Sequence, residues 1–525
     1  MDILIKNVHI IDGTGKRAYM GNVGIEKGKL VLDNLPDKAD VVIEGEGKCL
    51  APGFIDVHSH GDFVVGLEYG DLCKINQGVT THIAGQCGSS AAPYAACDPN
   101  DLFSTPEGLD PDFFKRREGW DIWSKYAEYV KTLPKVCNMR LFVSFNSIRK
   151  AVMGFDNRKP TVEEMQKMKD ILKDAMDAGA AGLSSGVAYV PATYVDTDEL
   201  CELVEVILPY DGIYTSHIRN ESWDLLNSVE EVIEIGRRTG AKVNVSHFKA
   251  MGRGNWGTHI KAIEAINKAI EEGIDITCDQ YPYNCSMTDY APCMPPWHFA
   301  EGKEKLVENL KQPEYRAAVR AEMEDPKTNY ENLYLNAGGW DGITICTSPN
   351  EPEAEGLTFS QYAAKIGKDP FDAYFDLIIV NECVGTAVYH SISDDDIFDI
   401  IKLPYVMVGS DGIVTSADKM CHPRGWGTMV RAICQFTKDN KIMPLEQLIH
   451  KMTGMAAERY MLKGKGKIAE GMDADLVLFD YAGLTDCATY SHPTNLAEGI
   501  ELVFVDGKIV YKEGKLTGEK PGKLL

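Results

Sequence analysis

The chain has 525 residues, of which 44% are hydrophobic and 25% are charged, so it can bury a sizeable core. Its formal net charge of −24 argues against a nucleic-acid partner, because there is no basic surplus to replace counterions. No uninterrupted apolar run approaches membrane-spanning length, and the first residues, MDILIKNVHIIDGTG, lack the layout of a signal peptide. The fourteen cysteines are scattered without a C-x-x-C pair, so we expect reduced thiols and a cytoplasmic protein.

Both ends of the chain have the pattern of short antiparallel strands. The first fifty residues contain DILIKNVHII, GNVGIEKGKLV and DVVIEG, in which apolar runs alternate with glycine turns. The C-terminal part repeats this pattern, and Asp506-Gly507 between two apolar runs predicts a hairpin. We therefore expect residues 1–50 and 465–525 to form one small β-sandwich domain, with a second domain inserted between them.

The middle of the chain alternates short apolar runs with amphipathic helices. Residues 161–178, for example, begin with Thr161 and Glu164 in capping-box spacing and continue with apolar residues on one helical face. Strand, helix and strand at intervals of roughly 30 residues are typical of βαβ units in a parallel sheet. Eight such runs favour an α/β fold with a (β/α)₈ barrel over residues 51–464. The predicted strands lie near 54–57, 80–84, 140–144, 182–185, 213–217, 243–247, 274–279 and 405–410.

One gap between these strands is too long for a single helix, because the seventh strand ends near 279 and the eighth begins near 405. Residues 286–342 lie in this gap and are rich in Lys, Glu and Tyr. We expect them to form a mostly helical insertion in the barrel. Insertions of this kind often cover a binding pocket.

The first predicted barrel strand ends in a pair of histidines, in the stretch APGFIDVHSHGD. His58 and His60 are two positions apart on a strand, so both imidazoles project from the same face. Burying two imidazoles is costly unless their nitrogens have partners, and a metal ion is the usual one. His-x-His alone is a weak signal, and the hypothesis needs further ligands elsewhere in the chain.

Further metal-ligating residue types follow other predicted strands, and in a (β/α)₈ barrel all these strand ends meet at one mouth. Any single one could be a packed core side chain, but six of them favour a metal site with room for two ions. The mixture of imidazole, thiolate and carboxylate favours Zn²⁺ over Ca²⁺ or Mg²⁺. Ligands spread over several strand ends suit an open catalytic site rather than a closed structural one. An open metal site supports hydrolysis of an amide, with Asp411 transferring the proton to the leaving nitrogen. The candidate ligands are His58, His60, Cys87, His217, His247 and Asp411.

The order of the motifs along the whole chain resembles one family. These motifs are GFIDVHSHGD, GQCGSS, GLSSGVAYVPATY, YTSHIRNES, VSHFKAMG, DQYPY, GSDG and HPRGWGT. They are similar to those of the N-acyl-D-amino-acid deacylases (D-aminoacylases) of the amidohydrolase superfamily. The resemblance implies zinc-dependent hydrolysis of N-acyl-D-amino acids to a carboxylate and a free D-amino acid. The expected partner is therefore a small molecule with a free carboxylate.

The resemblance also implies how the metal ligands are divided. Cys87, in place of the carboxylated lysine of many superfamily members, would bind a tight zinc ion with His217 and His247. The other three candidate ligands would frame a second, partly occupied position. Among them, Asp411 would be the catalytic acid/base.

Four further residues match substrate positions of the family. Lys249 in SHFK, Arg424 in HPR and Tyr281 in YPY match positions that hold the substrate carboxylate and the acyl-amide region. Tyr189 in VAYVPA matches a position that polarises the scissile carbonyl. Arg and Lys beside a metal site in an acidic protein are natural anchors for an anion.

One departure from the family and two alternative functions remain. The third strand reads VSFNSIR, with Asn146 and no histidine, where the family carries a stretch like GHGTLR. A cyclic-amide hydrolase of the hydantoinase or dihydroorotase kind is disfavoured by Cys87 and by the absence of a lysine in AGLSSG. A non-catalytic barrel scaffold is disfavoured because it would have no reason to keep the ligand set.

Overall fold

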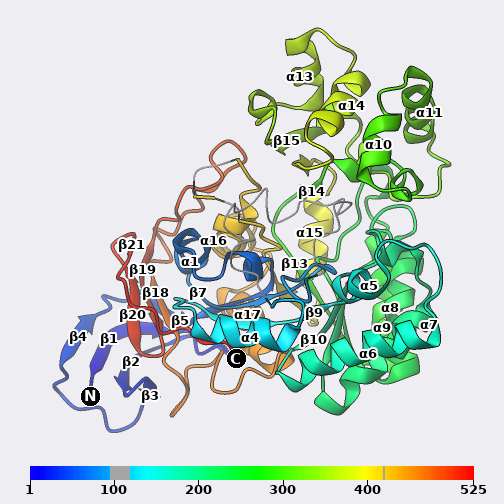
Figure 1. Ribbon diagram of the computed structural model, residues 1–525. Coiled ribbons are helices and arrows are strands. Elements are labelled where there is room, and N and C mark those ends of the chain that lie inside the picture. The colour runs from blue at the N-terminus through cyan, green and yellow to red at the C-terminus, as the bar shows by residue number, and fades with distance from the viewer. Residues whose placement is uncertain (95–118, 415, 418–419) are drawn as a thin grey trace.

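The computed structural model describes residues 1–94, 119–414, 416–417 and 420–525 (Figure 1). Both ends of the chain lie in one mixed sheet whose strand pairs are mostly antiparallel. The middle of the chain forms parallel strands with helices around them. The fold is therefore α/β, as the alternation of strands and helices predicted. None of the helices in the described ranges combines the length and the apolar character needed to cross a membrane.

The terminal sheet has nine strands and joins both ends of the chain. β5 pairs with β1 on one side and with β18 on the other, so hydrogen bonds connect the two halves edge to edge in one sheet. The hairpin at Asp506-Gly507 connects β19 and β20, and both turn residues have positive φ. The strands are β1 (Ile3–Ile10), β2 (Tyr19–Glu26), β3 (Lys29–Val31), β4 (Val41–Glu44), β5 (Cys49–Pro52), β18 (Leu476–Phe479), β19 (Ile500–Val505), β20 (Lys508–Lys512) and β21 (Lys515–Leu516).

The eight predicted parallel strands are all present. They pair in the orders β6-β7-β8 and β17-β13-β12-β11-β10-β9, and Phe142 alone separates β8 from β9. The amide of Asp411, just after β17, donates to the carbonyl of His58 in β6 at 2.7 Å. The strands are β6 (Phe54–Ser59), β7 (Val79–Ala84), β8 (Asn138–Leu141), β9 (Val143–Ser144), β10 (Gly182–Gly186), β11 (Ile213–His217), β12 (Lys242–Val245), β13 (Ile276–Gln280) and β17 (Val406–Val408).

The helices that connect or follow these strands pack apolar faces against the parallel strands. α6 begins with the predicted capping box, in which Glu164 N donates to Thr161 Oγ1 at 3.2 Å and Thr161 N donates to Glu164 Oε2 at 2.8 Å. Its buried side chains include Met168 and Leu172. The helices are α1 (Glu68–Ile75), α4 (Trp123–Thr132), α5 (Phe145–Met153), α6 (Val162–Asp177), α7 (Thr197–Ile207), α8 (Leu225–Thr239), α9 (His259–Glu271), α15 (Asp394–Ile401), α16 (Arg424–Ile433), α17 (Leu445–Met452) and α18 (Gly454–Arg459).

The excursion between β13 and β17 differs from the expected helical insertion over 286–342. It contains helices, but it also has a three-stranded antiparallel sheet, β14-β16-β15, and it runs on to Tyr389. The sheet closes this longer unit because β14 pairs with a strand about one hundred residues further along the chain. In Figure 1 the unit stands above the parallel strands. Its elements are β14 (Ser286–Asp289), α10 (Lys303–Asn309), α11 (Pro313–Glu324), α12 (Leu333–Asn336), β15 (Ile343–Thr347), α13 (Phe359–Ile366), α14 (Pro370–Val380) and β16 (Thr386–Tyr389).

Candidate active site

A cavity of about 510 Å³ lies between the ends of the parallel strands and the insertion. Five of the six predicted ligands line it, and the sixth, His58, is fully buried directly beneath them. The ligands come from the ends of β6, β7, β11, β12 and β17, as the barrel hypothesis required. The structure therefore brings all six predicted ligands together.

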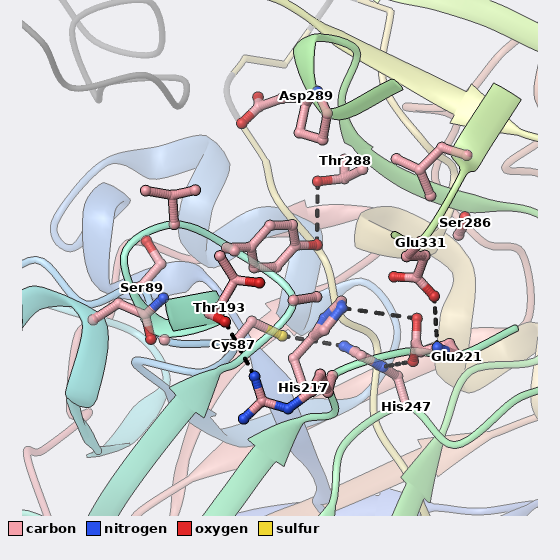
Figure 2. A pocket seen from close by; sticks show the side chains of 18 of the residues that line it. Cys87, Ser89, Thr193, His217, Glu221, His247, Ser286, Thr288, Asp289 and Glu331 are labelled. Atoms are coloured by element: carbon pink, nitrogen blue, oxygen red, sulfur yellow. Dashed lines mark hydrogen bonds and ion pairs between the residues drawn. The ribbon is translucent and has the colours of Figure 1, made fainter. Parts of the chain in front are cut away.

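The Cys87 sulfur lies between two imidazoles of this group. It is 3.1 Å from Nε2 of His58. It is also 3.2 Å from Nε2 of His247, and Figure 2 shows Cys87 beside His247. Potential ligand atoms of His58, Cys87, His247 and Asp411 all lie within 4.8 Å of one another. His60 joins this group through its Nε2, which is 3.1 Å from Oδ1 of Asp411. This arrangement is compact enough for one metal ion to be bound by several of these atoms.

A second candidate set shares His247 with the first. Potential ligand atoms of His217, Glu221 and His247 also lie within 4.8 Å of one another. The sequence reasoning did not include Glu221. Its position in SHIRNES, four residues after His217, was the only signal available, and a loop carboxylate at that spacing has no distinctive pattern.

Two buried carboxylates orient two of the histidines by contacting Nδ1, the ring nitrogen that does not face Cys87. Oδ1 of Asp279 lies 2.9 Å from Nδ1 of His58, and Oε1 of Glu221 lies 2.8 Å from Nδ1 of His247. A carboxylate partner at Nδ1 fixes the ring orientation and leaves Nε2 for a metal. Asp279 was also missed, although it ends β13 just as other site residues end their strands, and this rule could have found it.

Three of the candidate ligands have backbone conformations that L-residues rarely adopt. The φ angles are +53° at Cys87, +35° at His247 and +49° at Asp411. Each residue directly follows a parallel strand or lies within a few residues of its end. Such conformations cost on the order of 1 kcal/mol each and concentrate at functional sites. Here they turn the chain sharply where the side chains enter the cluster.

Asn146, in the third-strand stretch that lacks a histidine, has a structural role. Its side-chain amide donates to the carbonyl of Gly186 at 3.0 Å, and its Oδ1 accepts from the amide of Gly186 at 3.1 Å. It also closes the space beside Gly88, where a Cβ atom would lie 2.3 Å from Oδ1 of Asn146. Asn146 thus fixes the end of β10 against the turn that carries Cys87.

The charges of the site favour an ionised thiol and an ionised carboxyl. Burial alone would raise the pKa of Cys87, but the neighbouring His58 and His247 bring it well below the ordinary value. The thiolate is the form that binds metals. Burial would likewise raise the pKa of Asp411, but Arg424 and the nearby histidines hold it well below its usual range. NH1 of Arg424 is 2.8 Å from Oδ2 of Asp411.

Arg424 and Tyr281 present buried hydrogen-bond donors at the cavity. Both side chains are buried and line the cavity, with the guanidinium carbon 4.9 Å from the centre of the tyrosine ring. Within the described residues, neither Nε of Arg424 nor the hydroxyl of Tyr281 has a hydrogen-bond partner. Buried polar atoms are rarely left in this state without a function. The pair is suited to a carboxylate.

Lys249 and Tyr189 also line the cavity, as predicted, but both have partners within the protein. Nζ of Lys249 donates to Glu221 at 2.5 Å and to the carbonyl of His247 at 3.1 Å. The ring of Tyr189 lies 4.6 Å from that of His217, and its hydroxyl is 3.3 Å from Oγ1 of Thr288. Lys249 is thus fixed beside the imidazole of His247, and Tyr189 covers the other side of the cluster.

Comparison with known proteins places this geometry in a family. Residues 358–511 match the Amidohydrolase family. Over its full length the chain is 31% identical to a D-aminoacylase of Alcaligenes xylosoxydans xylosoxydans, covering 97% of that protein. It is 30% identical to an N-acyl-D-glutamate deacylase from the same organism, covering 96% of that protein.

A solved structure gives the same result. The N-acyl-D-glutamate deacylase of Bordetella bronchiseptica, complexed with zinc and a phosphonate inhibitor, superposes with a TM-score of 0.83 and 30% sequence identity. The match covers 100% of this chain and 99% of that one. Full-length similarity at this level, together with the motifs and the site geometry, identifies the family. The chain belongs to the N-acyl-D-amino-acid deacylase (D-aminoacylase) family of amidohydrolases.

Proposed function

We propose that this protein is a zinc-dependent hydrolase that splits N-acyl-D-amino acids into a carboxylate and a free D-amino acid. The observation that carries the proposal is the composition of one cavity. A cysteine surrounded by imidazoles lies at its base, and on its wall lie two buried donors, on Arg424 and Tyr281, that have no partner among the residues the structure describes. The first group suits a metal that activates an amide, and the second suits the free carboxylate of an acyl-amino acid.

The donor set fits zinc. We propose that Cys87, His217 and His247 hold the tight ion, and that His58, His60 and Asp411 frame a second, partly occupied position. Thiolate and imidazole ligands suit zinc, and carboxylates on the far nitrogens of two histidines strengthen such ligands. When bound, zinc supplies Lewis-acid chemistry, since it polarises a carbonyl and makes water more acidic.

Proton transfer, substrate binding and positioning of the ligands would then be carried out by different residues of the chain. Asp411, held ionised at the cavity, takes a proton from the attacking water as the oxygen adds to the acyl carbon. As the bond between carbon and nitrogen breaks, Asp411 returns the proton to the leaving nitrogen. Arg424 and Tyr281 hold the substrate carboxylate, while the hydroxyl of Tyr189 is placed to donate to the carbonyl oxygen. Lys249 and Glu221 keep His247 in position, and Lys249, which lines the cavity, also contacts the bound substrate.

We also propose that the parallel strands close into a (β/α)₈ barrel over residues 51–464, with the terminal β domain built from 1–50 and 465–525. The backbone contact between Asp411 and His58 supports closure between the last strand and the first. The insertion then begins at 286 and extends to at least 389. A cytoplasmic location remains a proposal from the cysteine pattern.

The test is a hydrolysis panel run together with metal analysis. It compares N-acetyl-D-amino acids with their L-enantiomers, and it includes hydantoins and dihydroorotate. Turnover confined to the D-series, with bound zinc, is the expected result. Turnover confined to the cyclic amides would favour the hydantoinase-like alternative. Bound zinc without any hydrolysis would favour the scaffold.

A further inference from the structure

Two large aromatic side chains lie exposed beside the cavity. Trp223 is 54% exposed and Trp297 is 45% exposed, and both contact Tyr330. Nε1 of Trp223 donates to the carbonyl of Tyr330 at 3.2 Å, and the ring of Trp297 lies 5.9 Å from the ring of Tyr330 in an edge-on arrangement. Trp223 and Tyr330 line the cavity. We call these three residues the aromatic rim.

The aromatic rim joins the barrel to the insertion close to the metal cluster. Trp223 follows β11, whereas Tyr330 belongs to the insertion. A second hydrogen bond runs parallel to the first, because the amide of Glu221 donates to Oε1 of Glu331 at 2.5 Å. Figure 2 shows Glu331 directly beside Glu221 and His247. The rim is therefore fixed relative to the residues that would hold the scissile bond.

The order of the strands indicates which part of a substrate meets this rim. Arg424 follows β17 and Tyr281 follows β13, while Trp223 follows β11, and the sheet order is β17-β13-β12-β11. The proposed carboxylate site is thus on one side of His247, at the end of β12, and the rim is on the other. In an acyl-amino acid, the carboxylate and the acyl chain lie on opposite sides of the scissile amide. A substrate held by Arg424 therefore directs its acyl chain toward the rim.

The cavity has both the size and the lining for such a chain. Its volume of about 510 Å³ is within the range that accommodates drug-sized ligands, which are larger than an acetyl-amino acid. The insertion adds apolar residues to the cavity wall, alongside the polar Asn329 and Glu331 that flank Tyr330. These apolar residues include Pro292, Met294, Pro296, Phe299 and Leu333.

Tyr330 is itself buried, but stability of the fold does not account for the exposed indole of Trp223. Trp223 leaves more than half of its surface in water, so it gains little hydrophobic stabilisation from its position. Exposed aromatic side chains that adjoin a cavity are instead typical of binding sites. We propose that the aromatic rim binds the acyl group, and that the preferred substrates are N-acyl-D-amino acids whose acyl chain is longer than acetyl. This inference rests on the proposed function.

The test is a series of N-acyl-D-alanines with acetyl, butanoyl, hexanoyl and octanoyl chains. D-Alanine keeps the side chain small, so only the acyl group varies. A fully buried methylene contributes about fourfold, and partial burial along the rim should raise kcat/KM at least tenfold from acetyl to octanoyl. A matched series of N-acetyl-D-amino acids with lengthening linear side chains serves as the second arm.

Trp223→Ala and Trp297→Ala should flatten the acyl series and leave the slope of the side-chain series unchanged. Trp256→Ala is the matched control, because Trp256 is 41% exposed but donates to the carbonyl of Ser391 and stacks with Arg253, whereas Trp223 and Trp297 contact Tyr330. Its acyl series should keep the slope of the unaltered protein. Circular dichroism and thermal unfolding verify that each variant is folded.

The outcomes separate this inference from the function on which it rests. A flat acyl series in the unaltered protein, with N-acetyl-D-alanine hydrolysed, overturns the inference and leaves the proposed function intact. A loss of slope in the side-chain series alone, when the rim residues are altered, also overturns the inference and leaves the proposed function intact. No hydrolysis of any N-acyl-D-amino acid, including those with other side chains, contradicts the proposed function itself.

Discussion

Nδ1 of His247 lies 2.8 Å from Oε1 of Glu221, and Nζ of Lys249 donates to the same oxygen. The contact orients the imidazole so that Nε2 faces the Cys87 sulfur at 3.2 Å. All of these side chains are buried or lie against the cavity, so the geometry is held by packing as well as by charge. The geometry of the metal site therefore depends on the carboxylate of Glu221, which is not one of the three proposed zinc ligands.

The first prediction concerns this carboxylate. Glu221→Gln keeps the size of the side chain but removes its charge, so His247 becomes a weaker ligand. Zinc affinity should fall by about 10- to 100-fold, measured by competition with a chromophoric chelator. Glu164→Gln is the control, because Glu164 caps α6 and pairs with Arg158 but is not among the described residues that line the cavity. Unchanged zinc affinity in Glu221→Gln would show that Glu221 does not support the site.

The second prediction concerns the thiolate. Cys87→Ala removes the atom that lies between two imidazoles, so the tight zinc ion should be lost. Metal analysis after dialysis should show about one ion fewer per chain. Cys73→Ala is the matched control, because Cys73 is a buried thiol whose pKa burial raises to about 12. Full zinc content and activity in Cys87→Ala would contradict the ligand assignment.

The third prediction concerns proton transfer. Asp411→Asn keeps the shape of the side chain but removes the proton acceptor, so kcat should fall by about 10²-fold or more. Binding of a product such as a D-amino acid should change much less, because Arg424 and Tyr281 remain. Steady-state kinetics and product inhibition give the two quantities. Near-normal turnover across the pH range would exclude Asp411 as the acid/base.

The fourth prediction concerns pH. Arg424 is the first of the charges that keep the pKa of Asp411 well below its usual range against the opposing effect of burial. Arg424→Gln removes this positive charge, so ionising Asp411 becomes harder and its pKa rises. Since the ionised form is the active one, the acidic limb of the kcat profile should move to higher pH. An acidic limb that stays in place would show that another group controls it.

Most of the fold and the proposed ligand set could be predicted because they depend on local patterns. A strand followed by His58 or Cys87 can be recognised within ten residues, and strand ends in a barrel meet at one mouth. Glu221 was missed because its role exists only in three dimensions, whereas the strand-end rule could have found Asp279 but not its partner. Asp279 contacts His58 across 221 positions of sequence, and no periodicity records such a contact.

The extent of the insertion was underestimated for a similar reason. Its helices have recognisable patterns, but β14 is only four residues long and finds its partner about one hundred residues later. Such a strand gains its stability from non-local pairing rather than from propensity. Tyr330 and Glu331 contact Trp223 and Glu221, about 110 positions earlier, so the part of the cavity nearest the rim could not be predicted from the sequence.

The last prediction concerns the substrate's free carboxylate, which separates an acyl-amino-acid deacylase from a general amidase. Nε of Arg424 and the hydroxyl of Tyr281 are buried at the cavity without partners in the described part of the chain, so an anion there would gain charge-assisted hydrogen bonds. The protein should prefer N-acetyl-D-amino acids over their methyl amides, and Arg424→Ala should lose most of this preference, at a cost of about 1.5–3 kcal/mol. Arg424→Lys should recover only part of it, because a lysine cannot reproduce the planar donor geometry. The comparison of kcat/KM for acids and methyl amides decides the matter, because equal hydrolysis of both by the unaltered protein would mean that the carboxylate is not recognised.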